Sequence, residues 1–251
     1  MMYRMRAALC TLCFICLIST FASAEGTVSL RLSTSQRAFA VEGFTLPGGQ
    51  PRPAVLILSG SRGYKSDAYR LLAAALNAAG IDAFLIHYMS DADDAKIHTT
   101  TVASERTAYY AERMPDWIAT IRVTIEALCQ QPIYHSKIGV FGISLGAMPV
   151  AVASTTSSTI AATTIVDGNF PEGFKSAIRT LPPLLLVWGT DDRVFPLSTG
   201  IKLRDLAQSI GTAAELHTFP GEGHGFFLAQ QNAHASEARS DVVEFFSRQL
   251  K

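Results

Sequence analysis

The chain has 251 residues, of which 48% are hydrophobic and 17% are charged, and its formal net charge is zero. This composition is typical of a globular protein with enough apolar residues to bury a substantial core, and a chain of this length usually forms one domain. The sequence has no basic excess, which argues against nucleic acid as a partner.

The first 24 residues have the pattern of a secretory signal peptide. Arg4 and Arg6 precede an apolar stretch at 7–18, and residues 22–24 match an A-x-A cleavage site. We therefore expect cleavage after Ala24, export to the periplasm or out of the cell, and no stable membrane association afterwards. An uncleaved anchor helix is the alternative, although the apolar stretch is short for a bilayer.

Removal of this leader also changes the cysteine chemistry. Three of the four cysteines lie within the leader, so the single domain expected at 25–251 keeps only Cys129. A domain with one cysteine has no internal disulfide. Cys129 falls on the expected inner face of a helix, which predicts a buried and unreactive thiol.

Hydrophobic patterns predict the strands and helices of this domain. Residues 27–33 and 38–45 alternate between apolar and polar side chains, as antiparallel strands at the edge of a sheet do. Short apolar runs, typical of strands covered on both faces, follow at 54–58, 81–86, 138–141, 161–166, 184–188 and 214–219. Helical spacing is found at 67–79, 115–129, 145–154, 198–210 and 236–250.

Residues 90–114 differ from the rest of the domain. The segment is polar, rich in Asp and Thr, and has no clear period. It is too long for an ordinary connection, so it is interpreted as a cap or a pocket-forming excursion. Pro115 is expected to open the helix that follows, because proline fits the first turn of a helix.

Strands and helices alternate from residue 54 onward. Parallel strands need crossover connections, so the pattern predicts an α/β fold with a mostly parallel sheet and helices on both faces. In such a sheet, ligands bind outside the carboxyl ends of the strands.

The sequence GISLG at 142–146 lies at one of these strand ends. A G-x-S-x-G turn between a buried strand and a helix is what a nucleophile elbow requires, because the residues beside the nucleophile must be small. Asp192 and His224 lie at the ends of later strands, so Ser144, Asp192 and His224 form a candidate triad. A serine hydroxyl needs a base to remove its proton, imidazole titrates near neutral pH, and a carboxylate holds the imidazole in the right tautomer.

Four segments together make the chain similar to a known fold family from residue 53 to the C-terminus. They read AVLILSGSRG, KIGVFGISLGA, LLLVWGTDDRVFP and FPGEGHGF. On these segments the chain resembles the α/β-hydrolase fold, and most closely its dienelactone-hydrolase-like branch. The resemblance implies that the acid lies three residues after Gly189, at Asp192 rather than Asp191, and that the base is His224. His87 also ends a strand at this edge, but no family motif places the base there.

The oxyanion hole and the nucleophile show where the chain departs from this family. One oxyanion N–H is expected from Leu145, and by position the second comes from Ser61, with Arg62 as the alternative. The resemblance implies a His-Gly pair just before, where this chain has Ser59-Gly60. Dienelactone hydrolase itself has a cysteine nucleophile and an activating glutamate, and both are absent here, so ordinary serine ester hydrolysis fits better.

The expected function is an exported serine hydrolase that acts on a small-molecule carboxylic ester through an acyl-enzyme. Arg62, Tyr64, His87 and Phe226 are expected to line its substrate pocket. No metal-ligand spacing and no phosphate-binding loop is apparent, so neither a metal nor a cofactor is expected. A peptidase, thioesterase or acyltransferase with the same triad is the alternative, followed by a non-catalytic binding protein. The sequence does not determine the oligomeric state.

Overall fold

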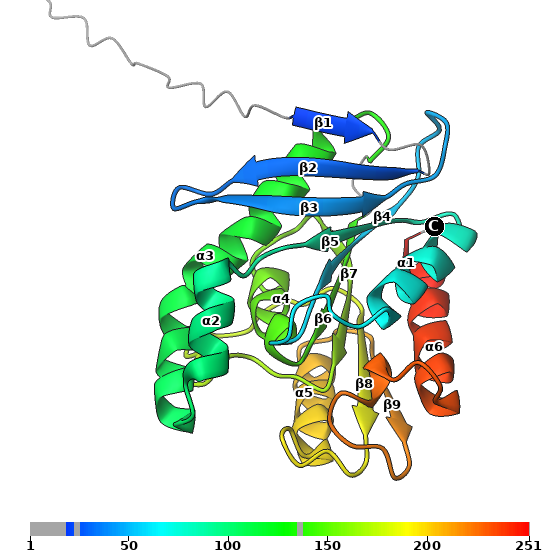
Figure 1. Ribbon diagram of the computed structural model, residues 1–251. Helices are drawn as coiled ribbons and strands as arrows, with labels where there is room; N and C mark the ends of the chain where they lie inside the picture. The colour runs from blue at the N-terminus through cyan, green and yellow to red at the C-terminus, as the bar shows by residue number, and fades with distance from the viewer. Residues whose placement is uncertain (1–18, 23–25, 135–137, 251) are drawn as a thin grey trace, which may run out of the picture.

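The computed structural model describes residues 19–22, 26–134 and 138–250, and these residues build one sheet flanked by helices (Figure 1). The sheet has nine strands in the order β1-β2-β3-β5-β4-β6-β7-β8-β9. The strands are β1 (Ser19–Ala22), β2 (Thr27–Ser33), β3 (Ala38–Phe44), β4 (Ala54–Leu58), β5 (Asp82–Ile86), β6 (Ile138–Ile143), β7 (Ile160–Val166), β8 (Leu184–Gly189) and β9 (Ala214–Phe219). The helices are α1 (Ala68–Ala78), α2 (Asp91–Thr99), α3 (Ala103–Cys129), α4 (Ala147–Ser154), α5 (Leu197–Ser209) and α6 (Ala233–Gln249).

The predicted α/β class and the mixed sheet are confirmed. Strands β1, β2, β3 and β5 pair antiparallel, whereas β5, β4, β6, β7, β8 and β9 pair parallel. All residues of β4, β5, β6 and β8 are buried, which explains why these strands are continuous apolar runs. Strand β2 alternates buried and exposed residues along its second half, as the pattern at 27–33 predicts.

Helices cover both faces of the sheet and define two main core regions. Helices α1 and α6 pack on one face, where they join a cluster that includes Leu72, Phe141 and Phe246. Helix α3 packs on the other face around Trp117, and α4 and α5 continue the coverage toward β8. With its faces covered, the sheet leaves the carboxyl ends of its parallel strands as the accessible edge for a site.

Residues 90–114 contribute to the pocket, as expected, but the structure corrects the expected start of a helix at Pro115. They form helix α2 and the first twelve residues of α3, so Pro115 lies inside a 27-residue helix and does not begin one. Apolar spacing is missing there because most side chains before Met114 face solvent or the pocket described below, and not the core. Pro115 removes one intrahelical donor to the carbonyl of Ala111, and both residues are exposed, so this carbonyl is not buried without a partner.

The predicted signal peptide at 1–24 lies mostly outside the described residues. Of the segment 1–24, only Ser19–Ala22 is described, and it pairs antiparallel with β2. Cys129, the last residue of α3, is a free, half-buried cysteine that packs against the core, and it is less buried than expected. None of the helices in the described part of the chain combines the length and the apolar character that crossing a bilayer requires.

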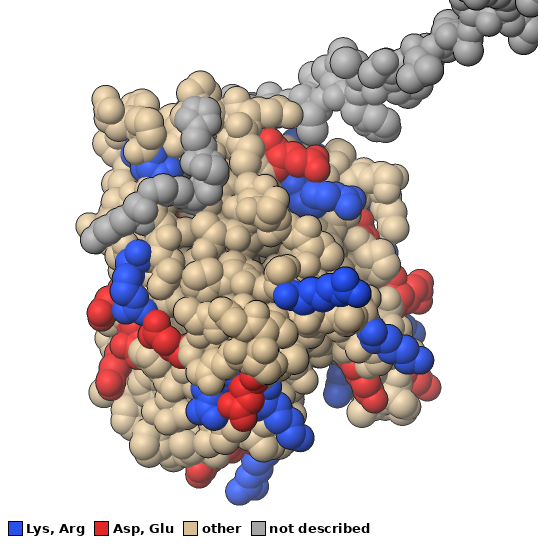
Figure 2. Space-filling view, turned by 180° about the vertical axis from the view of Figure 1, so that it is seen from behind, with Lys and Arg blue, Asp and Glu red and all other residues tan. Residues whose placement is uncertain are grey.

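The surface carries charges of both signs without a large single-sign patch on the face seen in Figure 2. Basic and acidic side chains are interspersed over this face and separated by uncharged residues. This distribution agrees with the net charge of zero.

Candidate active site

Ser144 occupies a strained turn at the carboxyl end of β6. Its φ of 52° lies in the left-handed region, where a residue with a side chain is uncommon. A Cβ at Gly142 would lie 2.5 Å from the Gly146 carbonyl oxygen, and one at Gly146 would lie 2.4 Å from the Ser59 carbonyl oxygen. Both glycines are therefore required by close backbone approach, as the G-x-S-x-G pattern predicts. The turn presents the Ser144 hydroxyl at the edge of the sheet.

Ser144, His224 and Asp192 form a continuous hydrogen-bonded chain. Ser144 Oγ lies 2.9 Å from His224 Nε2, and His224 Nδ1 lies 2.8 Å from Asp192 Oδ2. An ionised carboxylate only accepts hydrogen bonds, so Nδ1 carries the imidazole proton and Nε2 is free to accept the proton of Ser144. The structure thus brings the three predicted residues together in the geometry of nucleophile, base and acid.

The loop after β8 explains why Asp192 and not Asp191 reaches the histidine. Asp192 is buried, and its Oδ1 accepts hydrogen bonds from the N–H groups of Val194 and Phe195 at 2.7 and 2.9 Å. These bonds fix the carboxylate and leave Oδ2 for His224. Asp191 is exposed, and within the described part of the chain its carboxylate accepts only from its neighbour Thr190. The position that the resemblance implies for the acid, three residues after Gly189, is therefore the one whose carboxylate contacts His224.

Ser61 and Leu145, the predicted oxyanion donors, both line the pocket beside Ser144. Leu145 is the second residue of the helical segment Ser144–Gly146, so its N–H belongs to the first turn, where the helix offers no acceptor. Among the described residues, the Ser61 N–H also has no acceptor. Two free donors near the nucleophile are what a developing oxyanion needs.

Two tyrosines brace the loop that carries Ser61. The N–H of Gly60 donates to the hydroxyl oxygen of Tyr69 at 3.0 Å, and the hydroxyl of Tyr88 donates to the Ser59 carbonyl at 2.9 Å. Both tyrosines are fully buried. These two contacts brace the segment in which the resemblance implies a histidine that this chain lacks.

Asp167 is a further acidic residue at this site, and the sequence analysis did not single it out. It follows β7 directly and is completely buried. One of its carboxylate oxygens, one of Asp192 and one ring nitrogen of His224 all lie within 4.8 Å of one another. The sequence signal that could have identified Asp167 is its position directly after a buried strand, at the same edge of the sheet as Ser144. Within the described residues, this trio is the one group with metal-ligand spacing, but both His224 nitrogens already face Ser144 and Asp192.

A cavity of about 850 Å³ opens onto the triad. Helices α2 and α3 form one of its walls, and the segments after β4, β6, β7, β8 and β9 form the rest. Its apolar lining includes Ile97, Tyr110, Leu145, Met148, Phe170 and Phe195. Arg62, as predicted, and Arg106 supply positive charge, and Glu172 supplies a negative one.

Three residues expected in this pocket lie elsewhere. Tyr64 turns inward, where its hydroxyl lies 2.9 Å from the Ile86 carbonyl, and it borders a separate, smaller hollow together with His87. Phe226 is buried against Phe219 in the core under α6. These predictions were wrong because position along the chain places a residue near a strand end but does not determine which way its side chain points.

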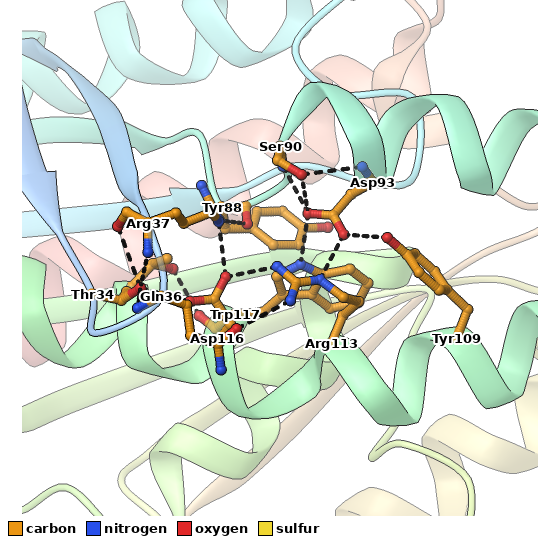
Figure 3. A network of polar contacts seen from close by, with 11 residues as sticks. Thr34, Gln36, Arg37, Tyr88, Ser90, Asp93, Tyr109, Arg113, Asp116 and Trp117 are labelled. Carbon is orange, nitrogen blue, oxygen red and sulfur yellow. Dashed lines mark hydrogen bonds and ion pairs between the residues drawn. The ribbon is translucent and has the colours of Figure 1, made fainter.

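A buried polar network fastens the α2–α3 wall to the sheet (Figure 3). Asp93 of α2 accepts hydrogen bonds from Arg113 Nε at 2.7 Å and from the Tyr109 hydroxyl at 2.6 Å, both on α3. Arg113 also donates to Asp116, and Asp116 accepts from Arg37 of the β2–β3 hairpin. The network therefore joins α2, α3 and the sheet through ion pairs that are largely shielded from solvent.

Asp93, at the centre of this network, has no exposed surface. Burial by itself raises the pKa of this carboxyl, but hydrogen bonds from Arg113, Tyr109 and Ser90 outweigh burial and hold the pKa at about 2. Ser90 and Asp93 also form a capping box that begins α2. Asp93 thus stays ionised at neutral pH and holds the pocket wall in place.

Comparisons with known proteins agree with this geometry. The family model described as "Dienelactone hydrolase family" matches residues 42–250. A search of the curated proteins finds no match to this sequence.

Solved structures share the fold at low sequence identity. A dienelactone hydrolase from Anabaena variabilis ATCC 29413 is 17% identical with a TM-score of 0.67, and the alignment covers 93% of this chain and 99% of that one. A dienelactone hydrolase-like promiscuous phosphotriesterase from metagenomic libraries is 21% identical with a TM-score of 0.72, covering 89% and 98%. Thermogutta terrifontis esterase 2 phosphorylated by paraoxon is 15% identical with a TM-score of 0.69, covering 90% and 95%.

Proposed function

Because the chain belongs to the dienelactone hydrolase family, we propose that it is a serine hydrolase that cleaves small carboxylic esters through the Ser144–His224–Asp192 triad. The observation that carries this proposal is the chain of two short hydrogen bonds from Ser144 through His224 to Asp192. Ser144 and His224 line a cavity that is large enough for a small organic ester.

The first half of the reaction forms an acyl-enzyme. Ser144 Oγ attacks the ester carbonyl carbon while His224 Nε2 takes the hydroxyl proton, and the buried Asp192 carboxylate stabilises the resulting imidazolium. The carbonyl oxygen becomes negative and accepts hydrogen bonds from the N–H groups of Ser61 and Leu145. The tetrahedral intermediate then expels the alcohol, which receives the proton from His224.

The second half releases the acid. His224 removes a proton from water, and the hydroxide oxygen attacks the acyl carbon on Ser144. The same two N–H groups hold the second oxyanion. Collapse of this intermediate breaks the bond to Ser144, whose oxygen takes the proton back from His224, so the net reaction is ester plus water to acid plus alcohol.

The test compares wild type with Ser144→Ala on p-nitrophenyl esters of increasing acyl length. We expect kcat/KM to fall by a factor of at least ~10⁴, because removal of the nucleophile leaves only binding and oxyanion stabilisation. A fluorophosphonate probe should label wild type at Ser144 and leave the variant unlabelled.

Ser209→Ala is a matched control, since this serine lies at the exposed end of α5 and its hydroxyl donates to the Leu206 carbonyl, away from the triad. It should keep wild-type activity. Wild-type rates for Ser144→Ala, measured on protein free of contaminating esterase, would refute the proposed function.

Export is a second part of the proposal, and it is supported by the leader pattern at 1–24. Cleavage after Ala24 would remove β1, because this strand consists of residues 19–22. Strand β2 would then become the edge of the sheet. The triad and the described residues that line the pocket all lie at position 61 or later, outside the leader.

A further inference from the structure

A second acidic residue, Asp167, lies behind the triad and has no role in the mechanism above. It follows β7, the strand next to the elbow strand β6, and none of its surface is exposed. Its φ of 44° is in the left-handed region, and among the described residues only Ser144 is another non-glycine residue with a positive φ. A strained backbone is kept only where surrounding contacts hold it, and such positions cluster at functional sites.

The Asp167 carboxylate joins the two loops that carry the other triad members. Oδ2 accepts a hydrogen bond at 3.0 Å from the N–H of Gly225, the residue directly after His224. Oδ1 accepts one at 3.3 Å from the N–H of Gly189, where the Asp192 loop begins. One side chain thus contacts the backbone on both sides of the His224–Asp192 pair.

The titratable groups that face Asp167 are those of the triad itself. Asp192 approaches from the loop after β8 and His224 from the loop after β9. Burial, and after it the nearby Asp192 charge, raise the pKa of Asp167, while the two backbone hydrogen bonds and His224 lower it, and the net effect is a pKa of about 7. Asp167 therefore exchanges its proton in the same pH range as a histidine.

We propose that Asp167 is a positioning residue that holds the His224 loop against the Asp192 loop and, once ionised, places a second negative charge behind His224. This inference rests on the proposed function, because it assigns Asp167 a role through the base of that reaction. Asp167 does not line the cavity, so it acts through His224 and not on the substrate.

The second charge has two consequences with opposite effects on rate. An ionised Asp167 favours the imidazolium form of His224, which stabilises the transition state in which His224 has gained a proton. The same charge also makes the imidazolium form harder to deprotonate, so the activity develops at higher pH. Wild type should therefore have a higher plateau of kcat, reached at a higher pH, than a variant with a neutral side chain at position 167.

Asp167→Asn removes the charge and keeps the shape of the side chain. We expect kcat to fall about tenfold at the plateau with KM unchanged, and the acid limb of kcat/KM to move to lower pH by on the order of one unit. Rates are normalised to the number of serines labelled by a fluorophosphonate. Asp205→Asn, which alters an exposed carboxylate on α5, is the matched control and should leave the profile in place.

A purely structural role predicts another result. Asp167→Asn would then lower the fraction of labelled protein but leave kcat per labelled serine and the acid limb unchanged, which would overturn the proposal. A carboxyl ¹³C titration of wild type labelled at aspartate covers the case in which the variant does not fold. A midpoint near pH 7 for the Asp167 signal supports the proposal, and a midpoint below about 5 overturns it. A wild type that is inactive on all esters contradicts the proposed function instead, and the titration then decides the inference by itself.

Discussion

Substitution of Asp93 by Asn tests whether the buried network controls the shape of the active site. Asp93 has a pKa of about 2 in the folded protein against 3.8 as a free side chain. At pH 7 this difference corresponds to about 2 kcal/mol of folding free energy. Because the folded pKa is depressed, the contribution is complete above pH 4 and is lost as the pH falls through about 2. The substitution also leaves the Arg113 guanidinium partly unpaired, so the total loss at pH 7 is expected to be about 2–4 kcal/mol.

Urea unfolding of wild type and Asp93→Asn at pH 7 and near pH 3 measures this contribution. We expect the difference between the two proteins to shrink by about 1 kcal/mol at the lower pH, where the unfolded wild type takes up a proton at Asp93. KM should rise severalfold, because the substitution loosens the wall formed by α2 and α3. Asp91→Asn is the matched control, since this exposed residue begins the same helix and its substitution should change stability by no more than about 0.5 kcal/mol. A stability difference that is equal at both pH values would refute the electrostatic reasoning.

Three further predictions concern the triad, the oxyanion loop and the leader. Asp192→Asn should lower kcat by about 10⁴ by favouring the wrong imidazole tautomer, whereas Asp191→Asn should stay within twofold of wild type; equal losses in steady-state assays would contradict the assignment of the acid. Tyr69→Phe removes the acceptor of the Gly60 N–H, so we expect kcat to fall by about tenfold to a hundredfold with little change in KM, and an unchanged kcat would show that this contact does not position the oxyanion loop. Mass spectrometry of the exported protein should find Glu25 at its N-terminus, and an intact residue 1 would contradict cleavage of the leader.

The structure agrees with the predictions that depend on local sequence patterns, namely the strands and the nucleophile turn. Buried parallel strands are continuous apolar runs and edge strands alternate, so strand order along the chain and the α/β class follow from periodicity alone. The glycines at 142 and 146 identify the elbow because only a missing Cβ permits the backbone contacts made there. Resemblance in four segments then placed Asp192 and His224 at the ends of the right strands.

Sequence patterns misled where a helix does not face the core. The first half of α3 and most of α2 have polar, aperiodic sequences because they cover a cavity, so the sequence predicts a pocket-forming segment at 90–114 but not its helices. Tyr64, His87 and Phe226 lie near strand ends but point away from the pocket. Periodicity reports which residues face the core, and it contains no information on which residues face a cavity.

By itself, the sequence determined the fold class through its hydrophobic periodicity and the nucleophile turn through the spacing of its glycines. Its resemblance to a known family in four segments then selected the candidate triad. Only the tertiary structure decided which side chains line the pocket, that Asp93 fastens its wall, and that Asp167 lies behind the triad. These features depend on contacts between segments far apart in the chain, such as the bond between the Asp167 carboxylate and the Gly225 N–H. Such contacts are set by how strands and loops pack, and they leave no local pattern in the sequence.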